Sequence, residues 1–365
     1  MGQVEILTAA LHVASFLFGA MLVAITLVSA VGTFVLPRGV VSPLTRAVFI
    51  AIRVVLDLWI RRLPTFAERD RVMAVYAPFG LLTLPVVWLA LVLLGYTGMF
   101  WALGVQPWSA ALVTSGSSLF TLGFASFSDL PTTLLAFTEA TIGLILIALL
   151  ISYIPTMYTA FSHRETAVTL LAVRAGSPPS AVELIERAHQ VNGLDRLHEL
   201  WVSWEQWFAE LEETHTSLAA LPYFRSSRPE RSWVTAAGTV LDAASLRAST
   251  LDLPRDAQAE LCIRAGFLAL RQIADLFRIP HNPDPQYGDP ISITRQEFDD
   301  AYERLARDGV PLKPDREQAW HDFAGWRVNY DAILIGLADR LMAPEALWSS
   351  DRLPAKRGLW YSRRR

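Results

Sequence analysis

The stretch SLFTLGFASFSDLP, residues 118–131, places small and hydroxyl-bearing residues inside a strongly apolar part of the sequence. Its single charged residue is Asp129. Long apolar runs lie on both sides, at residues 73–103 and 134–161. Irregular backbone at membrane depth is tolerated only where protein or water surrounds it. The composition of residues 118–131 therefore predicts backbone that is buried in protein or lines a water-filled path between two membrane helices.

The charged residues are unevenly distributed along the 365 residues, of which 52% are hydrophobic. Only 7 of the 32 Lys and Arg, and 6 of the 35 Asp and Glu, precede residue 161. This predicts a membrane part followed by a water-soluble part. Their net charges of +1 and −4 do not indicate nucleic-acid binding. The lone Cys262 cannot form an internal disulfide, which fits a cytoplasmic soluble part.

Three membrane spans are predicted, at residues 6–36, 73–103 and 134–161, because a span needs roughly 20 apolar residues. A cleaved signal peptide is the alternative for the first run. It is less favoured, because no Lys or Arg precedes the run and signal cores are only about 7–15 residues long.

Residues 43–63 are expected to form an amphipathic helix lying in the membrane interface, with Arg46, Arg53 and Asp57 at helical spacing. The alternative is a fourth span, which would put costly charges at membrane depth. All seven basic residues of the membrane part lie within residues 38–71, and none lies between the second and third spans. The positive-inside rule then predicts a multi-pass cell-membrane protein with its N-terminus outside and its C-terminal part cytoplasmic.

Residues 107–120 predict a helix of about three turns, roughly 20 Å long, which is too short to cross the membrane. We expect a re-entrant half-helix followed by extended backbone, in which Gly123 can adopt positive φ. The alternative is an ordinary loop on the outer surface of a helical bundle.

A span, a half-helix, a Thr-x-Gly-aromatic segment, an acidic residue and a second span resemble the pore module of potassium channels, whose selectivity filter reads TVGYG. The resemblance covers residues 73–161. It implies a filter of Thr121, Leu122, Gly123, Phe124 and Ala125, with Asp129 at the outer mouth. The expected ligands are potassium or other monovalent cations as permeant ions, without a cofactor.

The segment departs from the family pattern at three places: Ala125 replaces its second glycine, Phe120 replaces a threonine, and Ser126-Phe127-Ser128 lengthens the path to Asp129. A side chain at residue 125 is expected to remove or turn the outermost carbonyl ring. A single-glycine filter is similar to that of the Trk, Ktr and HKT transporters, which carry four modules per chain. This chain shows one module, so the resemblance implies a homotetramer.

Glu139 lies in the outer half of the third span, where a carboxylate is costly and by default functional. We expect it behind the filter as a support residue, accepting hydrogen bonds from Thr114, Ser117 or the filter backbone. The alternative is an acid near the start of a helix at headgroup level. By resemblance, Gly143 is a hinge and Pro155 a bend near the gate, whereas close helix contact and a simple kink are the ordinary alternatives.

The part after residue 161 predicts an α-helical domain, with helices at residues 181–190, 194–221, 256–277 and 316–341. A tryptophan stripe at residues 201, 204 and 207 indicates core packing. No zinc-ligand spacing, nucleotide-binding motif or hydrolase motif is found, so neither a metal site nor an enzyme is expected.

These patterns predict an all-α integral membrane protein. Residues 1–64 would hold the first span and the interfacial helix, residues 65–164 the pore module, and residues 165–365 a cytoplasmic domain. The favoured function is a homotetrameric cation channel that conducts potassium in the lipid bilayer, gated or assembled through an unidentified cytoplasmic ligand or protein. The alternative is a non-conducting membrane scaffold or sensor with a channel-derived fold, which would not require several chains around one axis.

Overall fold

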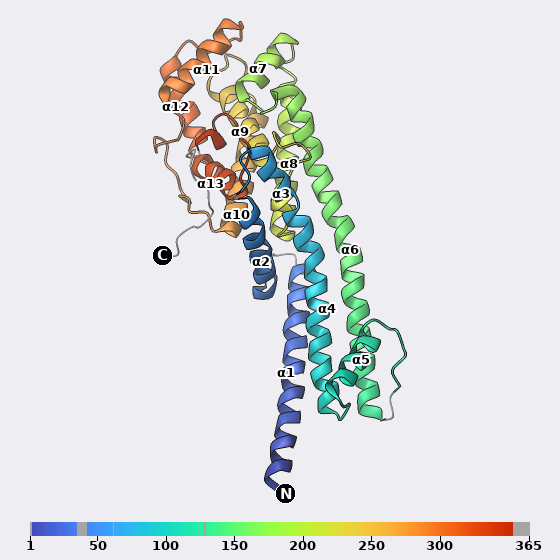
Figure 1. The fold of residues 1–365 in the computed structure, drawn as a ribbon. Coiled ribbons are helices and arrows are strands. Elements are labelled where there is room, and N and C mark those ends of the chain that lie inside the picture. Colours follow the sequence, from blue (N-terminus) through green and yellow to red (C-terminus); the bar gives the residue numbers. More distant parts are fainter. Residues whose placement is uncertain (1, 35–41, 61, 127–128, 353–365) are drawn as a thin grey trace. The chain divides into compact units, whose positions relative to one another are not determined.

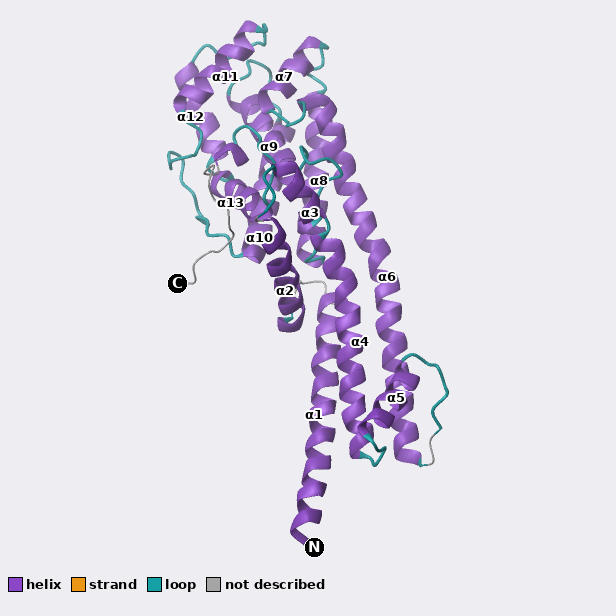
Figure 2. Cartoon of the chain, in the orientation of Figure 1, coloured by secondary structure: helices purple, strands orange, loops and turns teal. Residues whose placement is uncertain are grey.

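The computed structural model describes residues 2–34, 42–60, 62–126 and 129–352. Apart from one β-bridge, the regular secondary structure of these residues is helical (Figure 1; Figure 2). A single β-bridge joins Leu251 and Leu312. Three helical stretches in these residues are long and apolar enough to cross a membrane: Val4–Phe34, Phe66–Ala102 and Leu130–Ala175. The predicted all-helical class and the three long apolar helices are confirmed.

The chain folds into two compact units. The first unit consists of Met1–Leu56 and Val75–Thr159, and the second of Asp57–Ala74 and Ala160–Arg365. This division differs from the three predicted regions, because residues 57–74 join the second unit.

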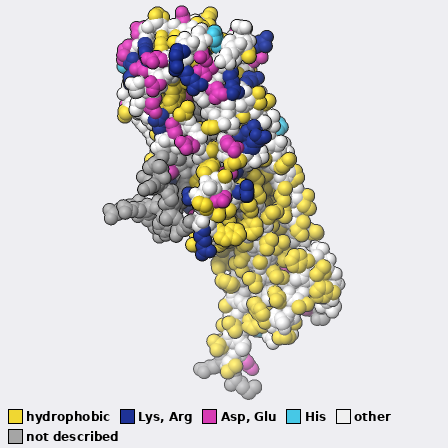
Figure 3. All heavy atoms as spheres, turned by 45° about the horizontal axis from the view of Figure 1, so that its top comes forward, with side chains coloured by type: hydrophobic (Ala, Val, Ile, Leu, Met, Phe, Trp, Pro, Cys, Tyr) yellow, Lys and Arg dark blue, Asp and Glu magenta, His cyan; other side chains and the backbone are white. Residues whose placement is uncertain are grey.

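The first unit is built from long helices: α1 (Gly2–Phe34), most of α2 (Pro43–Ile60), α4 (Tyr76–Ala102), α5 (Trp108–Leu119) and the first part of α6 (Leu130–Ala175). Helix α2 is not among the three candidate spans. Hydrophobic side chains cover the visible surface of the long apolar helices (Figure 3). An apolar exterior of this kind fits helices that face lipid.

Helices α1 and α4 cross at glycines. A Cβ atom on Gly19 would overlap the carbonyl oxygen of Gly95, and one on Gly95 would lie 2.8 Å from the carbonyl oxygen of Gly19. One turn along, the Ser15 hydroxyl donates a hydrogen bond to the Gly98 carbonyl (3.0 Å). Small residues thus let the two backbones approach, which is how membrane helices gain packing contact.

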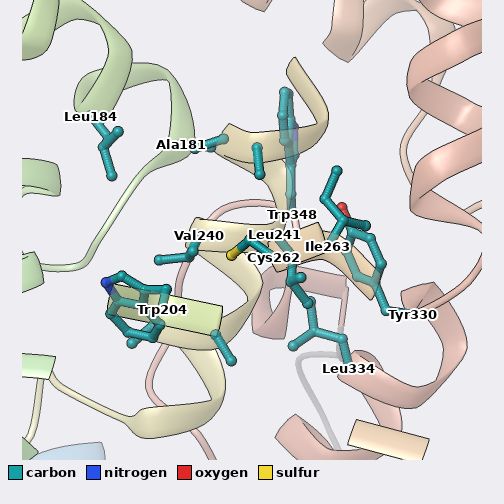
Figure 4. Packing of buried hydrophobic residues seen from close by; sticks show 14 of the residues in the cluster. Ala181, Leu184, Trp204, Val240, Leu241, Cys262, Ile263, Tyr330, Leu334 and Trp348 are labelled. Carbon is teal, nitrogen blue, oxygen red and sulfur yellow. The ribbon is translucent and has the colours of Figure 1, made fainter. Parts of the chain in front are cut away.

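The second unit contains α3 (Phe66–Ala74), the last part of α6, and a set of shorter helices: α7 (Ala181–Gln190), α8 (Leu197–Ser217), η1 (Leu221–Tyr223), α9 (Trp233–Ser249), α10 (Ala257–Phe277), α11 (Arg295–Arg307), α12 (Arg316–Arg327), α13 (Asp331–Leu341) and η2 (Ser350–Arg352). Its core gathers Trp204, Val240, Cys262, Tyr330 and Trp348 (Figure 4). The three tryptophans of the stripe, at residues 201, 204 and 207, are buried in this core as expected.

Two features of the second unit differ from the predicted helices. The predicted helix at residues 316–341 is two helices, α12 and α13, because the chain turns at residues 328–330. Helix α9 was not predicted. All but one of its side chains are buried, so it lacks the polar face on which amphipathic periodicity depends.

Arg164, which follows the apolar part of α6, is buried with all five of its N–H donors used. It donates to Glu165 twice, to His215 Nε2 (3.3 Å), and to the carbonyl oxygens of Leu221 (3.0 Å) and Phe224 (2.6 Å). A guanidinium group has five donors and no acceptor. His215 must therefore accept at Nε2, which requires the neutral imidazole.

The second unit is expected to become less stable as the pH falls, because of His215. Burial, together with the charge of Arg164, lowers the pKa of His215 well below 6.5. Below about pH 6.5 the unfolded chain binds a proton at this residue that the folded chain excludes. The free energy of unfolding then decreases by up to about 1.4 kcal/mol per pH unit as the pH falls.

Urea unfolding of the full chain in detergent, followed by tryptophan fluorescence, measures this slope. His215→Gln keeps an acceptor and removes the titration, so its slope between about pH 6.5 and pH 5 should be smaller than that of the wild type. Burial raises the pKa of Asp242 to about 6, which changes stability in the opposite direction, but equally in both proteins. Equal slopes in the two proteins would contradict a neutral His215.

Candidate functional site

Ser117, near the end of α5, organises the loop that follows this helix. Its carbonyl oxygen accepts hydrogen bonds from the backbone N–H groups of Leu122 (2.8 Å) and Gly123 (3.4 Å). Its hydroxyl oxygen accepts from the N–H groups of Phe124 and Ala125 (3.1 Å each). Four consecutive N–H groups therefore converge on one buried residue.

This convergence depends on the backbone conformation of residues 121–124. Thr121 and Gly123 have φ of 54° and 73°, whereas Leu122 and Phe124 do not have positive φ. In an extended strand, successive peptide groups point to opposite sides. Alternation of positive and negative φ instead allows successive N–H groups to turn to one side. Gly123 adopts this conformation without strain, while Thr121 does so at a cost.

Ala125 does not have positive φ. The conformation seen here therefore does not require a glycine at this position. The orientation of the outermost carbonyl ring in an assembled pore stays a prediction.

The residues predicted as a filter are largely exposed in the single chain. Thr121, Leu122, Gly123 and Phe124 are exposed and Ala125 is partly buried. Leu122 and Phe124 are 61% and 63% exposed, an exposure that many large apolar side chains of the long apolar helices share. A Cβ atom on Gly123 would meet no atom within 4 Å. The side of the loop away from Ser117 is thus uncovered in the chain alone.

Asp129 lies where α6 begins. Its carboxylate accepts hydrogen bonds from the Thr132 backbone N–H (3.0 Å) and hydroxyl (2.7 Å). These bonds satisfy first-turn groups of α6, as an N-cap residue does. The local structure gives Asp129 a capping role, and its predicted position at an outer mouth is a separate proposal.

Helix α5 is held against α6 at two points one turn apart. Ser115 lies against Glu139, with 2.5 Å between the hydroxyl oxygen and Oε1. Leu119 lies against Gly143, where a Cβ atom would overlap the Leu119 carbonyl oxygen. Residues 115 and 119, like residues 139 and 143, share one helix face. Gly143 is therefore required for close contact with α5, and α6 continues through it unbroken.

Thr114 and Ser117, which were predicted to donate hydrogen bonds to Glu139, make other contacts. In the hydrogen bonds of the described residues, Glu139 contacts neither Thr114 nor Ser117, and Thr114 contributes its carbonyl oxygen to Ser118 (3.1 Å). Pro155 lies within the continuous α6. Ser115 was not predicted, since a serine among other small residues gives no periodic signal. Its spacing of four from Leu119, matching Glu139 and Gly143, was the available clue.

The part of the chain that the structure describes contains no group of three or more His, Cys, Asp or Glu side chains placed to hold a metal ion. No protein-family model, curated protein or solved structure matches this chain. Any functional conclusion therefore rests on the geometry of the chain itself.

Proposed function

We propose that the protein is a cation channel that conducts potassium, and that residues 121–125 line the ion path. The observation that supports this most directly is the convergence of four backbone N–H groups on Ser117. With these N–H groups turned inward and bonded, carbonyl oxygens of the loop are left to face the uncovered side. Rings of such oxygens can replace the hydration shell of a cation. The proposed function needs no cofactor.

Four copies of the chain form the proposed pore, because each chain supplies one such loop. The exposed Leu122 and Phe124 are available for contact with neighbouring chains in this assembly. Thr121 and Asp129 would face the ion path and its outer mouth. Residues 107–126 form the re-entrant segment in this arrangement, with α4 and α6 as the flanking spans.

The proposed orientation in the cell membrane places the N-terminus outside and the second unit in the cytoplasm, because all basic residues of the membrane part lie within residues 38–71. The second unit would gate or assemble the pore. Within it, Arg225 pairs with Asp70 on α3, the helix directly before α4, and Arg164 anchors α6 just after its apolar part. Asp70 and Arg164 are close in sequence to α4 and to the apolar part of α6, and Gly143 and Pro155 are the candidate gating positions on α6.

Flux measurements in liposomes test the proposed function. Purified protein should pass potassium and exclude chloride, and its protein mass in detergent should be four times the 40.6 kDa of one chain. Ser117→Ala removes the acceptor for two loop N–H groups and should reduce potassium flux strongly, because the loop loses its fixed conformation.

Ser118→Ala is the matched control. Among the described residues the Ser118 hydroxyl bonds only to the Thr114 carbonyl within α5, so its loss should leave flux near the wild-type value. A monomeric wild-type protein that passes no cation would refute the channel and leave a non-conducting scaffold or sensor as the better assignment.

A further inference from the structure

The Glu139 carboxyl group is enclosed where α4, α5 and α6 meet. The residue has 0% exposure, and its Oε2 atom has no hydrogen-bond partner among the described residues. The other oxygen, Oε1, lies 2.5 Å from the Ser115 hydroxyl, which also lies 3.0 Å from the Leu93 carbonyl oxygen on α4. A buried carboxyl group with one unpartnered oxygen requires an explanation.

The hydrogens available around Ser115 indicate which form of Glu139 fits these contacts. A serine hydroxyl carries a single hydrogen, and a backbone carbonyl oxygen can only accept. If Glu139 were ionised, Ser115 would face two acceptors with one hydrogen, and one contact would bring two oxygens together without a hydrogen between them. If Glu139 carries a proton, it donates to Ser115, which donates to Leu93. Both short contacts are then hydrogen bonds.

The surroundings also disfavour a charge on Glu139. The sequence has no Lys or Arg between residues 72 and 163. On α4, the titratable side chain that interacts electrostatically with Glu139 is the Tyr96 phenol, which donates a hydrogen bond to the Thr138 hydroxyl (3.1 Å). The contact from α5 is the uncharged Ser115, and the other acid of this part of α6 is the exposed cap residue Asp129. A buried carboxylate without a cation is far more costly than a neutral carboxyl group.

We propose that Glu139 is a protonated positioning residue that donates a hydrogen bond to Ser115 and thereby fixes α5 against α6. Ser115 and Ser117 are two positions apart and so lie on opposite faces of α5. One face is held by Glu139 and Gly143, while the other holds the 121–125 loop. The effect of Glu139 on ion flux rests on the proposed function, whereas its protonation does not.

Infrared spectroscopy of the full-length protein in lipid tests the protonation. The spectra are recorded at about pH 8, above the value of about 6 to which burial raises the pKa of Asp242. The difference spectrum between wild type and Glu139→Gln should then contain one protonated-carboxyl C=O band that shifts in D₂O. A difference spectrum with carboxylate bands and no such C=O band would overturn the proposal.

Flux through the same variants tests the positioning role. The glutamine amide is neutral and can donate to Ser115, so Glu139→Gln should keep flux near wild type, whereas Glu139→Ala should lower it. Thr141→Ala, at an exposed position on α6, is the control and should leave flux unchanged. Equal loss in the glutamine and alanine variants would overturn the positioning role. The C=O band in a protein that passes no ions would support the protonation and reject the channel instead.

Discussion

Gly123→Val should reduce potassium flux through the reconstituted protein to background while the protein still inserts and assembles. Gly123 has φ of 73°, and a β-branched residue adopts such angles only with strain. The substitution should cost about 1–2 kcal/mol locally, too little to unfold the chain. It should nevertheless release the loop from Ser117, because relaxed φ angles turn the N–H groups of residues 122–125 away from this residue.

Two further variants separate backbone conformation from side-chain size. Gly104 also has positive φ (98°) and open space around it, but lies between α4 and α5. Gly104→Val should therefore carry a comparable strain and leave flux intact. Asparagine tolerates positive φ, so Gly123→Asn should retain part of the flux. Wild-type flux in an assembled Gly123→Val protein would show that residues 121–125 do not line the path.

The long apolar helices were predictable because hydrophobic length is a strong signal, and residues 107–120 were predicted within one residue at each end of α5. The end of α6 was not predicted. The chain changes from apolar to amphipathic near residue 161 without a glycine or proline, so the helix continues to Ala175. A change from apolar to amphipathic sequence does not by itself end a helix, and α6 ends where Gly176 adopts positive φ.

The loop itself was only partly predictable. The need for positive φ at Gly123 follows from its residue type, but positive φ at Thr121 does not, because threonine disfavours it. The roles of Ser115 and Ser117 arise from contacts with α4, α6 and the returning loop. These contacts depend on how the helices pack, and local sequence does not encode that packing.

Arg327→Met should destabilise the second unit by about 3–5 kcal/mol, the cost of leaving a buried charge without its partner. The Arg327 side chain has 0% exposure and donates to Asp242 (2.6 Å), Asp331 (2.7 Å) and the Trp348 carbonyl (2.5 Å). These contacts join α9, α12, α13 and the chain before η2. Asp331 also accepts from Ser292, whereas in the described part of the chain Asp242 keeps only the Tyr330 hydroxyl when the guanidinium is removed.

The pH dependence of this loss identifies its cause. Burial already raises the pKa of Asp242 to about 6 in the presence of Arg327, and removal of the positive charge should raise it further. A raised folded-state pKa gives stability that is lost as pH rises through it, so the difference between Arg327→Met and wild type should be larger at about pH 8 than at about pH 5. Urea unfolding of the full chain in detergent measures this difference.

Arg255→Met is the matched control, because Arg255 makes a two-point ion pair with Glu260 while its side chain is 80% exposed. Exposed pairs contribute little, so its unfolding midpoint should barely move at either pH. Adding Asp242→Asn to Arg327→Met removes the stranded charge and should recover part of the lost stability at about pH 8. Arg327→Met and Arg255→Met proteins of equal stability would show that the buried pair does not hold α9, α12 and α13 together, and that apolar packing alone does so.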